Sequence, residues 1–527
     1  MTLGMDELLT LGQMLAVHAR LRGDWMGARD LDRAMTFRQW DERSCRLANA
    51  LLGLGLAKGG RVAVLAYNCV EWAEIYAATA KAGLVAVPVN FRLLGPEVRF
   101  IVEDAEASAL IVQDELLGVV EDIRADLPVP PGNLIHFGER PCPAGFRAYE
   151  DLLAAASSRE PGVPVLPSDP WMLMYTSGTT GHPKGAVRSH RGGALLSLIT
   201  EVELGIGRGD GALLVMPMCH ANSLYFFGAF SYCGASTTIY SRKSFDPEHC
   251  VRTLAEGGAA FTSLVPTHYT TMLALPAAVR ARYNLDRVTK LMISSAPARP
   301  ETKRAVMEMF RHSGLFELYG ATEIGWATML HPAEQFTHLG SVGRECVGSA
   351  PIRLLDEAGQ EVPDGQPGEL YAATPYAFDG YWKLPDKTRD AFRGEYCTVG
   401  DMARRDADGY IHLVDRKSNM VISGGENVYP SEVEALLAAH PAVRDVAVIG
   451  LPDPKWGERV HAAVVLHEGA ALDEAGLLDW SRDRMAGYKR PRSCSFMREE
   501  EMPRNALGKV LYQVLKAQLT GSSGQNA

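Results

Sequence analysis

Short apolar runs alternate with helix-like patterns through the first two-thirds of the chain. Residues 61–66 and 84–89 are apolar almost throughout and predict strands, and residues 72–82 between them predict a helix. The strand pattern returns at residues 212–216, 261–265 and 290–293. Strands that follow one another so closely through helices indicate parallel sheets covered by helices. Ligands of such sheets bind beyond the carboxyl ends of the strands, so we expect the chemistry there.

From residue 340 onward the pattern changes to segments rich in glycine, proline and aspartate, with short strand signals. After residues 415–419 a further unit begins with a predicted helix over 431–439, where Ser431 and Glu434 have the spacing of a capping box. Predicted strands at 446–449 and 460–466 and a helix over 473–484 follow. We therefore predict an α/β protein with one domain over residues 1–417 and a second over residues 418–527.

Length and charge narrow the class of protein. A chain of 527 residues exceeds the usual size of one domain. The net charge of -10 disfavours nucleic-acid binding, for which a basic face is typical. The 9 cysteines are scattered without C-x-x-C pairs, as is typical of reduced cytosolic thiols. Because no apolar run approaches the ~18 residues of a membrane helix, we expect a cytoplasmic protein without a transmembrane segment.

One loop concentrates the chemistry of phosphate binding. Residues 175–185 follow an apolar run and combine glycines, hydroxyls and a lysine, so several donors can face one polyphosphate. The Walker pattern is not met, because Pro183 stands at a Walker glycine position and Gly185 follows the lysine. Taken alone, this composition also suits a surface linker. The candidate phosphate contacts are Thr176, Ser177, Gly178, Thr179, Thr180, Gly181 and Lys184.

Four further segments carry related chemistry, at residues 318–323, 396–401, 422–427 and 503–509. With the loop, they resemble in order and composition the adenylate-forming enzymes of the AMP-binding superfamily, which includes acyl- and aryl-CoA synthetases, nonribosomal peptide adenylation domains and beetle luciferase. The C-terminal part is similar to bacterial 4-chlorobenzoate-CoA ligases. The resemblance implies a large N-terminal domain of layered sheets with helices and a β-rich subdomain, and a small mobile C-terminal α/β domain.

The resemblance also implies an ATP-dependent ligase that joins a fatty or aromatic carboxylic acid to coenzyme A. The acid would first form an acyl-adenylate with release of pyrophosphate, and CoA would then displace AMP. In matching positions, Glu323 would bind Mg²⁺, Thr322 would contact the α-phosphate, and Lys509 would bridge carboxylate and phosphate. The other nucleotide contacts implied are Ser295, Ala296, Pro297, Tyr319 (adenine), Gly320, Asp401 (ribose) and Arg416.

The second step implies rotation of the small domain about a hinge. The matching position is Ser418, where relatives more often carry Asp or Lys, so the hinge electrostatics stay open. Gly424 and Gly425 match glycines that line the pantetheine tunnel, although a tight turn would also explain them. The residues matched to the nucleotide end of CoA are Trp456, Lys489 and Arg490.

The pocket for the acid is the least defined part of the prediction. His220 matches a catalytic-site position beside the substrate carboxylate. Tyr225, Phe226 and Phe227 suit either the pocket or the core, and Trp326 would limit the pocket's depth. Residues 221–223 carry no carboxylate to pair with a substrate amine, which disfavours amino-acid activation.

Several alternatives stay open beside the CoA ligase. The nearest is an adenylation enzyme that transfers an acyl or aminoacyl group to a carrier protein. A P-loop ATPase or kinase is disfavoured by the failed Walker pattern. A non-enzymatic binding protein would be expected to lack Glu323, Asp401 or Lys509. The sequence specifies neither the acid nor the oligomeric state, and a homodimer is left open.

Overall fold

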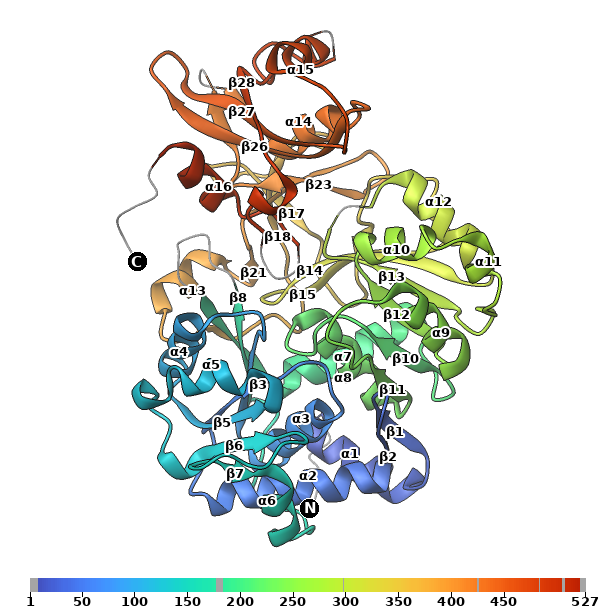
Figure 1. Ribbon diagram of the computed structural model, residues 1–527, viewed down its shortest axis with the longest axis vertical. Helices are drawn as coiled ribbons and strands as arrows, with labels where there is room; N and C mark the ends of the chain where they lie inside the picture. The colour runs from blue at the N-terminus through green and yellow to red at the C-terminus, as the bar shows by residue number, and fades with distance from the viewer. Residues whose placement is uncertain are drawn as a thin grey trace. The chain divides into compact units, whose positions relative to one another are not determined.

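The structure is a computed structural model that describes residues 8–176, 183–296, 298–423, 426–482, 484–504 and 508–521. The chain forms two compact units, one of Met1–Ile352 with Ala372–Cys397 and the other of Arg353–Tyr371 with Thr398–Ala527. Each unit combines helices with strands (Figure 1), which confirms the α/β class. The boundary near Ser418 falls inside the second unit and stays a prediction. The candidates that lie outside the described residues are Ser177, Gly178, Thr179, Thr180, Gly181, Pro297, Gly424 and Gly425.

A sheet with strand order β19-β9-β8-β4-β3-β5-β6-β7 forms part of the first unit. Its strands are β3 (Arg61–Leu65), β4 (Val85–Val89), β5 (Ala107–Gln113), β6 (Leu134–Phe137), β7 (Arg147–Ala148), β8 (Pro170–Thr176), β9 (Lys184–Ser189) and β19 (Gly380–Tyr381). Pairing is parallel from β8 to β7 and antiparallel for β8–β9 and β9–β19. Val62 and Val64 enter one core and Ala63 and Leu65 another, which explains the uninterrupted apolar run.

A second sheet of the same unit has the order β16-β15-β14-β13-β12-β10-β11-β1-β2. Its strands are β1 (Met26–Arg29), β2 (Ala34–Thr36), β10 (Gly211–Leu214), β11 (Ser236–Ile239), β12 (Phe261–Leu264), β13 (Lys290–Ile293), β14 (Gly314–Ala321), β15 (Gly325–Leu330) and β16 (Arg344–Glu345). Pairing is parallel from β1 to β14, and β14 then turns back into the antiparallel β15. The end of β14 carries the predicted motif of residues 318–323.

Helices cover both sheets and separate one from the other (Figure 1). One core joins the facing sides of the sheets through α2, α3, α7 and α8, whereas α4 and α5 pack on the outer side of the first sheet and α9, α10 and α12 on the outer side of the second. The helices are α1 (Leu11–Arg22), α2 (Phe37–Gly53), α3 (Glu71–Ala82), α4 (Gly95–Asp104), α5 (Leu117–Glu121), α6 (Tyr149–Ala155), α7 (His190–Leu204), α8 (Ala221–Cys233), α9 (Pro247–Gly257), α10 (Pro266–Leu273), α11 (Ala277–Arg280), α12 (Pro300–Met309) and α13 (Pro385–Ala391). After α13, β20 (Phe392–Arg393) pairs with β21 (Tyr396–Cys397).

The second unit contains two smaller sheets. One has the order β17-β18-β22-β23, formed by β17 (Arg353–Leu355), β18 (Gly368–Tyr371), β22 (Asp401–Arg405) and β23 (Ile411–Arg416). The other contains β24 (Val421–Ser423), β25 (Glu426–Val428), β26 (Val443–Asp453), β27 (Gly457–Leu466) and β28 (Ser493–Phe496). Helices α14 (Pro430–Leu437) and α15 (Glu474–Ser481) pack on one face of this sheet and α16 (Tyr512–Leu519) on the other.

The predicted strands and helices are confirmed, with ends that shift by a few residues, but the predicted capping box is wrong. Helix α14 begins at Pro430, so Ser431 lies inside the helix, and its hydroxyl donates to the Val414 carbonyl. Proline is favoured at the first helical position because no N–H is needed there. Glu434 instead accepts a hydrogen bond from the Val448 amide at 2.7 Å.

Two broader expectations concern thiols and membranes. The 9 cysteines all lie in the described residues, where each is a free thiol. Among the helices that the structure describes, none is long and apolar enough to cross a membrane.

Candidate active site

The two ends of the predicted phosphate loop meet on the β8–β9 hairpin. Thr176 and Lys184 are direct partners across the antiparallel pair. The Thr176 hydroxyl lies 3.4 Å from the Lys184 carbonyl oxygen. Of the loop candidates, these two can therefore be placed, and they lie at the same end of the hairpin.

Glu323 lies beside that hairpin end. Its side chain is buried, with the residue 6% exposed. The Tyr381 hydroxyl donates to Glu323 Oε1 at 2.9 Å, and the Thr176 hydroxyl lies 3.3 Å from the same oxygen. The Lys184 ammonium lies 4.1 Å from the centre of the Tyr381 ring. The lysine Lys184, the hydroxyl of Thr176 and the buried carboxylate of Glu323 thus come together around Tyr381.

Arg188 fixes the main chain that carries the carboxylate. Its Nη1 donates to the carbonyl oxygens of Thr322 at 3.0 Å and Glu323 at 3.1 Å. Its guanidinium also lies over the Tyr225 ring, 5.3 Å from the centroid. The turn after β14 is therefore tied to β9, the strand that begins with Lys184.

The donor set fits a magnesium ion. Mg²⁺ prefers oxygen ligands and is usually held by one or two carboxylates together with phosphate oxygens and water. Glu323 offers one buried carboxylate, oriented through Oε1 by Tyr381. A hydroxyl at Thr176 and a cation at Lys184 stand beside it for the phosphates. The residues present thus suit a metal–polyphosphate complex.

The candidate adenine and α-phosphate contacts gather at the carboxyl ends of two adjacent strands. β13 and β14 pair in parallel, so residues 294–296, which follow β13, and Tyr319, near the carboxyl end of β14, lie at the same edge of the sheet. Ser295 has a φ of 68°, a left-handed conformation that non-glycine residues adopt rarely. Gly320 leaves no room for a side chain, since a Cβ there would lie 2.2 Å from the Gly325 carbonyl oxygen. Tyr319 is buried, and Ala296 lies next to Ser295.

His220 stands at the start of α8, where it occupies the N-cap position and is half-buried. Two residues further on, Asn222 Nδ2 donates to Ser294 Oγ at 2.8 Å. This bond links the start of α8 to the end of β13. His220 therefore belongs to the same region of the first unit as the nucleotide candidates Ser295 and Ala296.

Aromatic side chains form a wall next to Thr322. The Tyr225 hydroxyl donates to the Thr322 carbonyl at 3.0 Å, and its ring meets Trp326 edge-on at 5.2 Å. Trp326 Nε1 donates to Thr200 Oγ1 at 2.9 Å, which fixes the indole. Phe226 stacks on Trp326, and Phe227 packs against Trp40 and Tyr76 in the core. Of the aromatic trio, Tyr225 is thus the one tied to the candidate site, and Phe227 is a core residue.

The second unit holds the remaining nucleotide candidates. Asp401 and Arg416 are partners across β22–β23, and Arg416 Nε lies 3.1 Å from Asp401 Oδ1. Lys509 is an exposed residue that lies near both charges. Partial desolvation of its ammonium, followed by the positive charge of Arg416, lowers the pKa of Lys509, and Asp401 opposes that shift. These three predicted residues therefore share one electrostatic environment.

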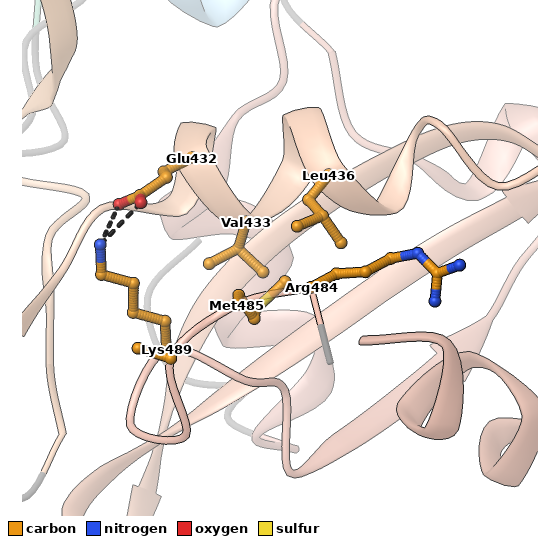
Figure 2. A pocket seen from close by; sticks show the side chains of 7 residues that line it. Glu432, Val433, Leu436, Arg484, Met485 and Lys489 are labelled. Carbon is orange, nitrogen blue, oxygen red and sulfur yellow. Dashed lines mark hydrogen bonds and ion pairs between the residues drawn. The ribbon is translucent and has the colours of Figure 1, made fainter. Parts of the chain in front are cut away.

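The candidates for CoA lie elsewhere on the second unit. Trp456 has Arg492 3.9 Å and Lys455 4.8 Å from its ring centre, so it is flanked by cations. Lys489 pairs with Glu432 at 2.6 Å and lines a small pocket between α14 and the segment after α15 (Figure 2). Arg490 is half-buried. The pocket is lined by Glu432, Val433, Leu436, Arg484, Met485, Ala486 and Lys489.

Sequence reasoning missed Arg188 and Tyr381. A signal for Arg188 existed: it lies four residues after Lys184, and residues at even spacing share one face of a strand. Tyr381 gave no comparable signal. It lies 58 residues beyond Glu323 in the sequence and reaches the site because its short edge strand, β19, pairs with β9.

Comparison with known proteins places the chain in a family. The model for the AMP-binding enzyme family matches residues 16–382, and the model for the AMP-binding enzyme C-terminal domain matches residues 432–509. A feruloyl-CoA synthase from Amycolatopsis sp is 34% identical over 95% of this chain and 97% of its own length. The fatty acid–[acyl-carrier-protein] ligase ScoC from Streptomyces coeruleorubidus is 32% identical over 98% of each chain.

The solved structures agree with the sequence relatives. The crystal structure of the anthranilate CoA ligase AuaEII in complex with anthranoyl-AMP superposes with a TM-score of 0.87 at 28% identity, covering 98% of both chains. This similarity confirms the expected architecture of layered sheets with a further α/β unit. The chain therefore belongs to the AMP-binding enzyme family and is an adenylate-forming acid–thiol ligase.

Proposed function

We propose that this enzyme is an ATP-dependent carboxylic acid–CoA ligase, with an aromatic acid as the preferred substrate and a fatty acid as the second choice. The observation that carries the proposal is the convergence of Thr176, Lys184 and Glu323 around Tyr381. A hydroxyl and an ammonium at one end of a buried carboxylate suit a magnesium–polyphosphate complex, as ATP-driven activation of an acid requires.

In the first step, a carboxylate oxygen of the acid attacks the α-phosphorus of ATP and the bond to the β-phosphate oxygen breaks. Pyrophosphate leaves with the bonding electrons, and an acyl-adenylate forms. Lys184 and the loop that begins at Thr176 would hold the departing pyrophosphate. Glu323 would hold Mg²⁺, which supplies neutralisation of the phosphate charges. Thr322 would contact the α-phosphate, where negative charge concentrates during the transfer.

In the second step, a thiol sulfur attacks the acyl carbon and AMP leaves, while the thiol proton passes to solvent. In the first step, Lys509 would bridge the carboxylate and the phosphate, and Asp401 would hold the ribose. Their shared environment with Arg416 supports a joint role toward one nucleotide. Trp456 between two cations supports a site for the nucleotide end of CoA.

The aromatic wall supports the choice of acid. Tyr225 and Trp326 are each fixed by a hydrogen bond, to the Thr322 carbonyl and the Thr200 hydroxyl. A planar acid bound beside these fixed side chains has no flexible chain to order, which favours it over a long alkyl acid. The named substrates of two similar proteins, feruloyl and anthranoyl groups, are also aromatic.

A second candidate thiol is that of an acyl carrier protein. The similarity to ScoC, a fatty acid–[acyl-carrier-protein] ligase, supports this alternative acceptor. Free CoA and a phosphopantetheinylated carrier protein present the same thiol arm, so thioester yield with each at equal concentration separates the two acceptors.

The experiment that tests the acid is ATP–pyrophosphate exchange across a panel of benzoate-type, cinnamate-type and straight-chain alkyl acids at matched concentration. We expect exchange to depend on the acid and to be fastest with an aromatic one. Faster exchange with long alkyl acids would contradict the choice of acid. Absence of exchange with every acid would contradict the proposed activation step.

A further inference from the structure

Tyr381 lies between two residues that the proposed function assigns to different tasks. Its hydroxyl donates to Glu323 Oε1 at 2.9 Å, and its ring faces the Lys184 ammonium at 4.1 Å. One side chain thus contacts both the candidate metal ligand and the candidate phosphate cation. Tyr381 itself is 7% exposed.

The backbone of Tyr381 is held firmly. β19 pairs with β9 through Tyr381 opposite Ala186, and the Tyr381 amide donates to Thr388 Oγ1 at 2.8 Å. The Phe378 ring meets the Tyr381 ring at 4.8 Å in an edge-on contact. A buried ring held by strand pairing, a side-chain acceptor and an aromatic neighbour has little freedom to move.

The chemistry of the two contacts differs. A phenol that donates to one carboxylate oxygen restricts the carboxylate to one orientation, as partners of metal ligands commonly do. An aromatic face attracts an ammonium without supplying the negative charge of a carboxylate, which would compete with a phosphate for it. Tyr381 can therefore orient Glu323 and hold Lys184 at the same time.

We propose that Tyr381 is a positioning residue that couples metal binding at Glu323 to phosphate binding at Lys184, a role that rests on the proposed function of these two residues. The Tyr381 hydroxyl orients the Glu323 carboxylate, and the Tyr381 ring holds the Lys184 ammonium. The two parts can be removed separately, because phenylalanine keeps the ring and leucine keeps neither.

The test measures ATP binding by calorimetry at graded Mg²⁺ concentrations and in EDTA, with acid-dependent pyrophosphate exchange as a second readout. Tyr381→Phe is expected to raise the Mg²⁺ midpoint about tenfold and to leave metal-free ATP binding unchanged. Tyr381→Leu is expected to weaken metal-free ATP binding as well, by roughly threefold to tenfold.

Tyr149→Phe is the matched control. In the wild type, the Tyr149 hydroxyl donates to the buried carboxylate of Glu74 at 2.8 Å, in the same unit but outside the set of candidate site residues. A second variant, Thr388→Val, removes the acceptor of the Tyr381 amide without altering Tyr381 and should shift the Mg²⁺ midpoint in the same direction by a smaller factor. Thr388→Val therefore still tests the inference if Tyr381→Phe does not fold.

A wild-type Mg²⁺ midpoint in Tyr381→Phe, or equal shifts in Tyr381→Phe and Tyr149→Phe, would overturn the inference. The inference is also overturned if neither Tyr381 variant, once folded, nor Thr388→Val moves the Mg²⁺ midpoint. The proposed function fails differently: the wild-type enzyme itself would then show no effect of Mg²⁺ on ATP binding and no exchange with any acid.

Discussion

Arg188 donates from Nη1 to the main-chain carbonyl of Glu323 at 3.1 Å, and the same nitrogen reaches the carbonyl of Thr322 at 3.0 Å. Arg188 is 2% exposed, so these acceptors replace the water that Nη1 would otherwise bind. The turn that follows β14 is therefore fixed to β9, and the spacing between Lys184 and Glu323 depends on this contact.

Replacing Arg188 by lysine should slow acyl-adenylate formation about 100-fold, since a misplacement of about 1 Å at a reacting site costs that much. Lysine carries its donors on a flexible stem and lacks the planar guanidinium that lies over the Tyr225 ring, so the donor that reaches both carbonyls would no longer be held in place. ATP–pyrophosphate exchange measures the effect. Arg46→Lys is the control, because Arg46 Nη1 also donates to two main-chain carbonyls of the same unit, those of Leu153 and Ala156. Equal rates in both variants would contradict the role given to Arg188.

Much of the fold could be predicted from the sequence because strands buried on both faces are apolar throughout. β3 and β4, which are apolar after Arg61, were recognised in this way. The antiparallel turns at β8–β9 and β14–β15 could not, since side-chain alternation is the same in parallel and antiparallel strands.

The candidate site was predicted in part for a related reason. Thr176, Lys184 and Glu323 stand in local motifs and were identified from them. Tyr381 reaches the same carboxylate from a short edge strand, and that contact depends on tertiary structure alone. The predicted capping box failed because Pro430, not Ser431, begins α14, which leaves Glu434 to contact Val448 and Tyr512.

Glu434 should make the stability of the second unit depend on pH. Burial raises its pKa from 4.5 to about 7, with Asp415 and Asp445 adding negative charge and Tyr512 and the Val448 amide opposing the shift. The folded state therefore holds the proton more tightly than the unfolded state, and stability falls as pH rises from 4.5 through 7. Above pH 7 the ionised carboxylate should cost about 3 kcal/mol.

Glu434→Gln removes this charge and should protect β26 amides from hydrogen exchange better than the wild type does at pH 8, with a much smaller difference at pH 5. Comparison at equal pH cancels the intrinsic dependence of exchange on pH. The opposite order at pH 8, or a difference independent of pH, would contradict the sign.

Lys509→Ala should lower acyl-adenylate formation by about 100-fold or more, the usual effect of removing one donor to developing charge. Thioester formation from supplied acyl-AMP should be largely spared. Lys516→Ala, which removes a lysine of α16 paired with Glu458 at 2.6 Å, is the control. Equal loss in both half-reactions would exclude the bridging role of Lys509.

Lys489→Glu together with Arg490→Glu should raise the KM for CoA about tenfold, which corresponds to the loss of one charge-assisted contact. Because Lys489 already pairs with Glu432, Arg490→Glu alone should account for most of the rise. Arg482→Glu serves as the control, as Arg482 pairs with Asp479 on the surface of the same region. An unchanged response to CoA in the double variant would remove this assignment.

The central claim is that one enzyme first activates an acid with ATP and then transfers it to a thiol. Product release in a single reaction, sampled before and after CoA is added, tests it most directly. We predict that pyrophosphate is released before CoA is added, and only when an acid is present. AMP and acyl-CoA should then appear together after CoA is added. Release of ADP and phosphate, or of AMP and acyl-CoA without prior formation of an acyl-adenylate, would contradict the account.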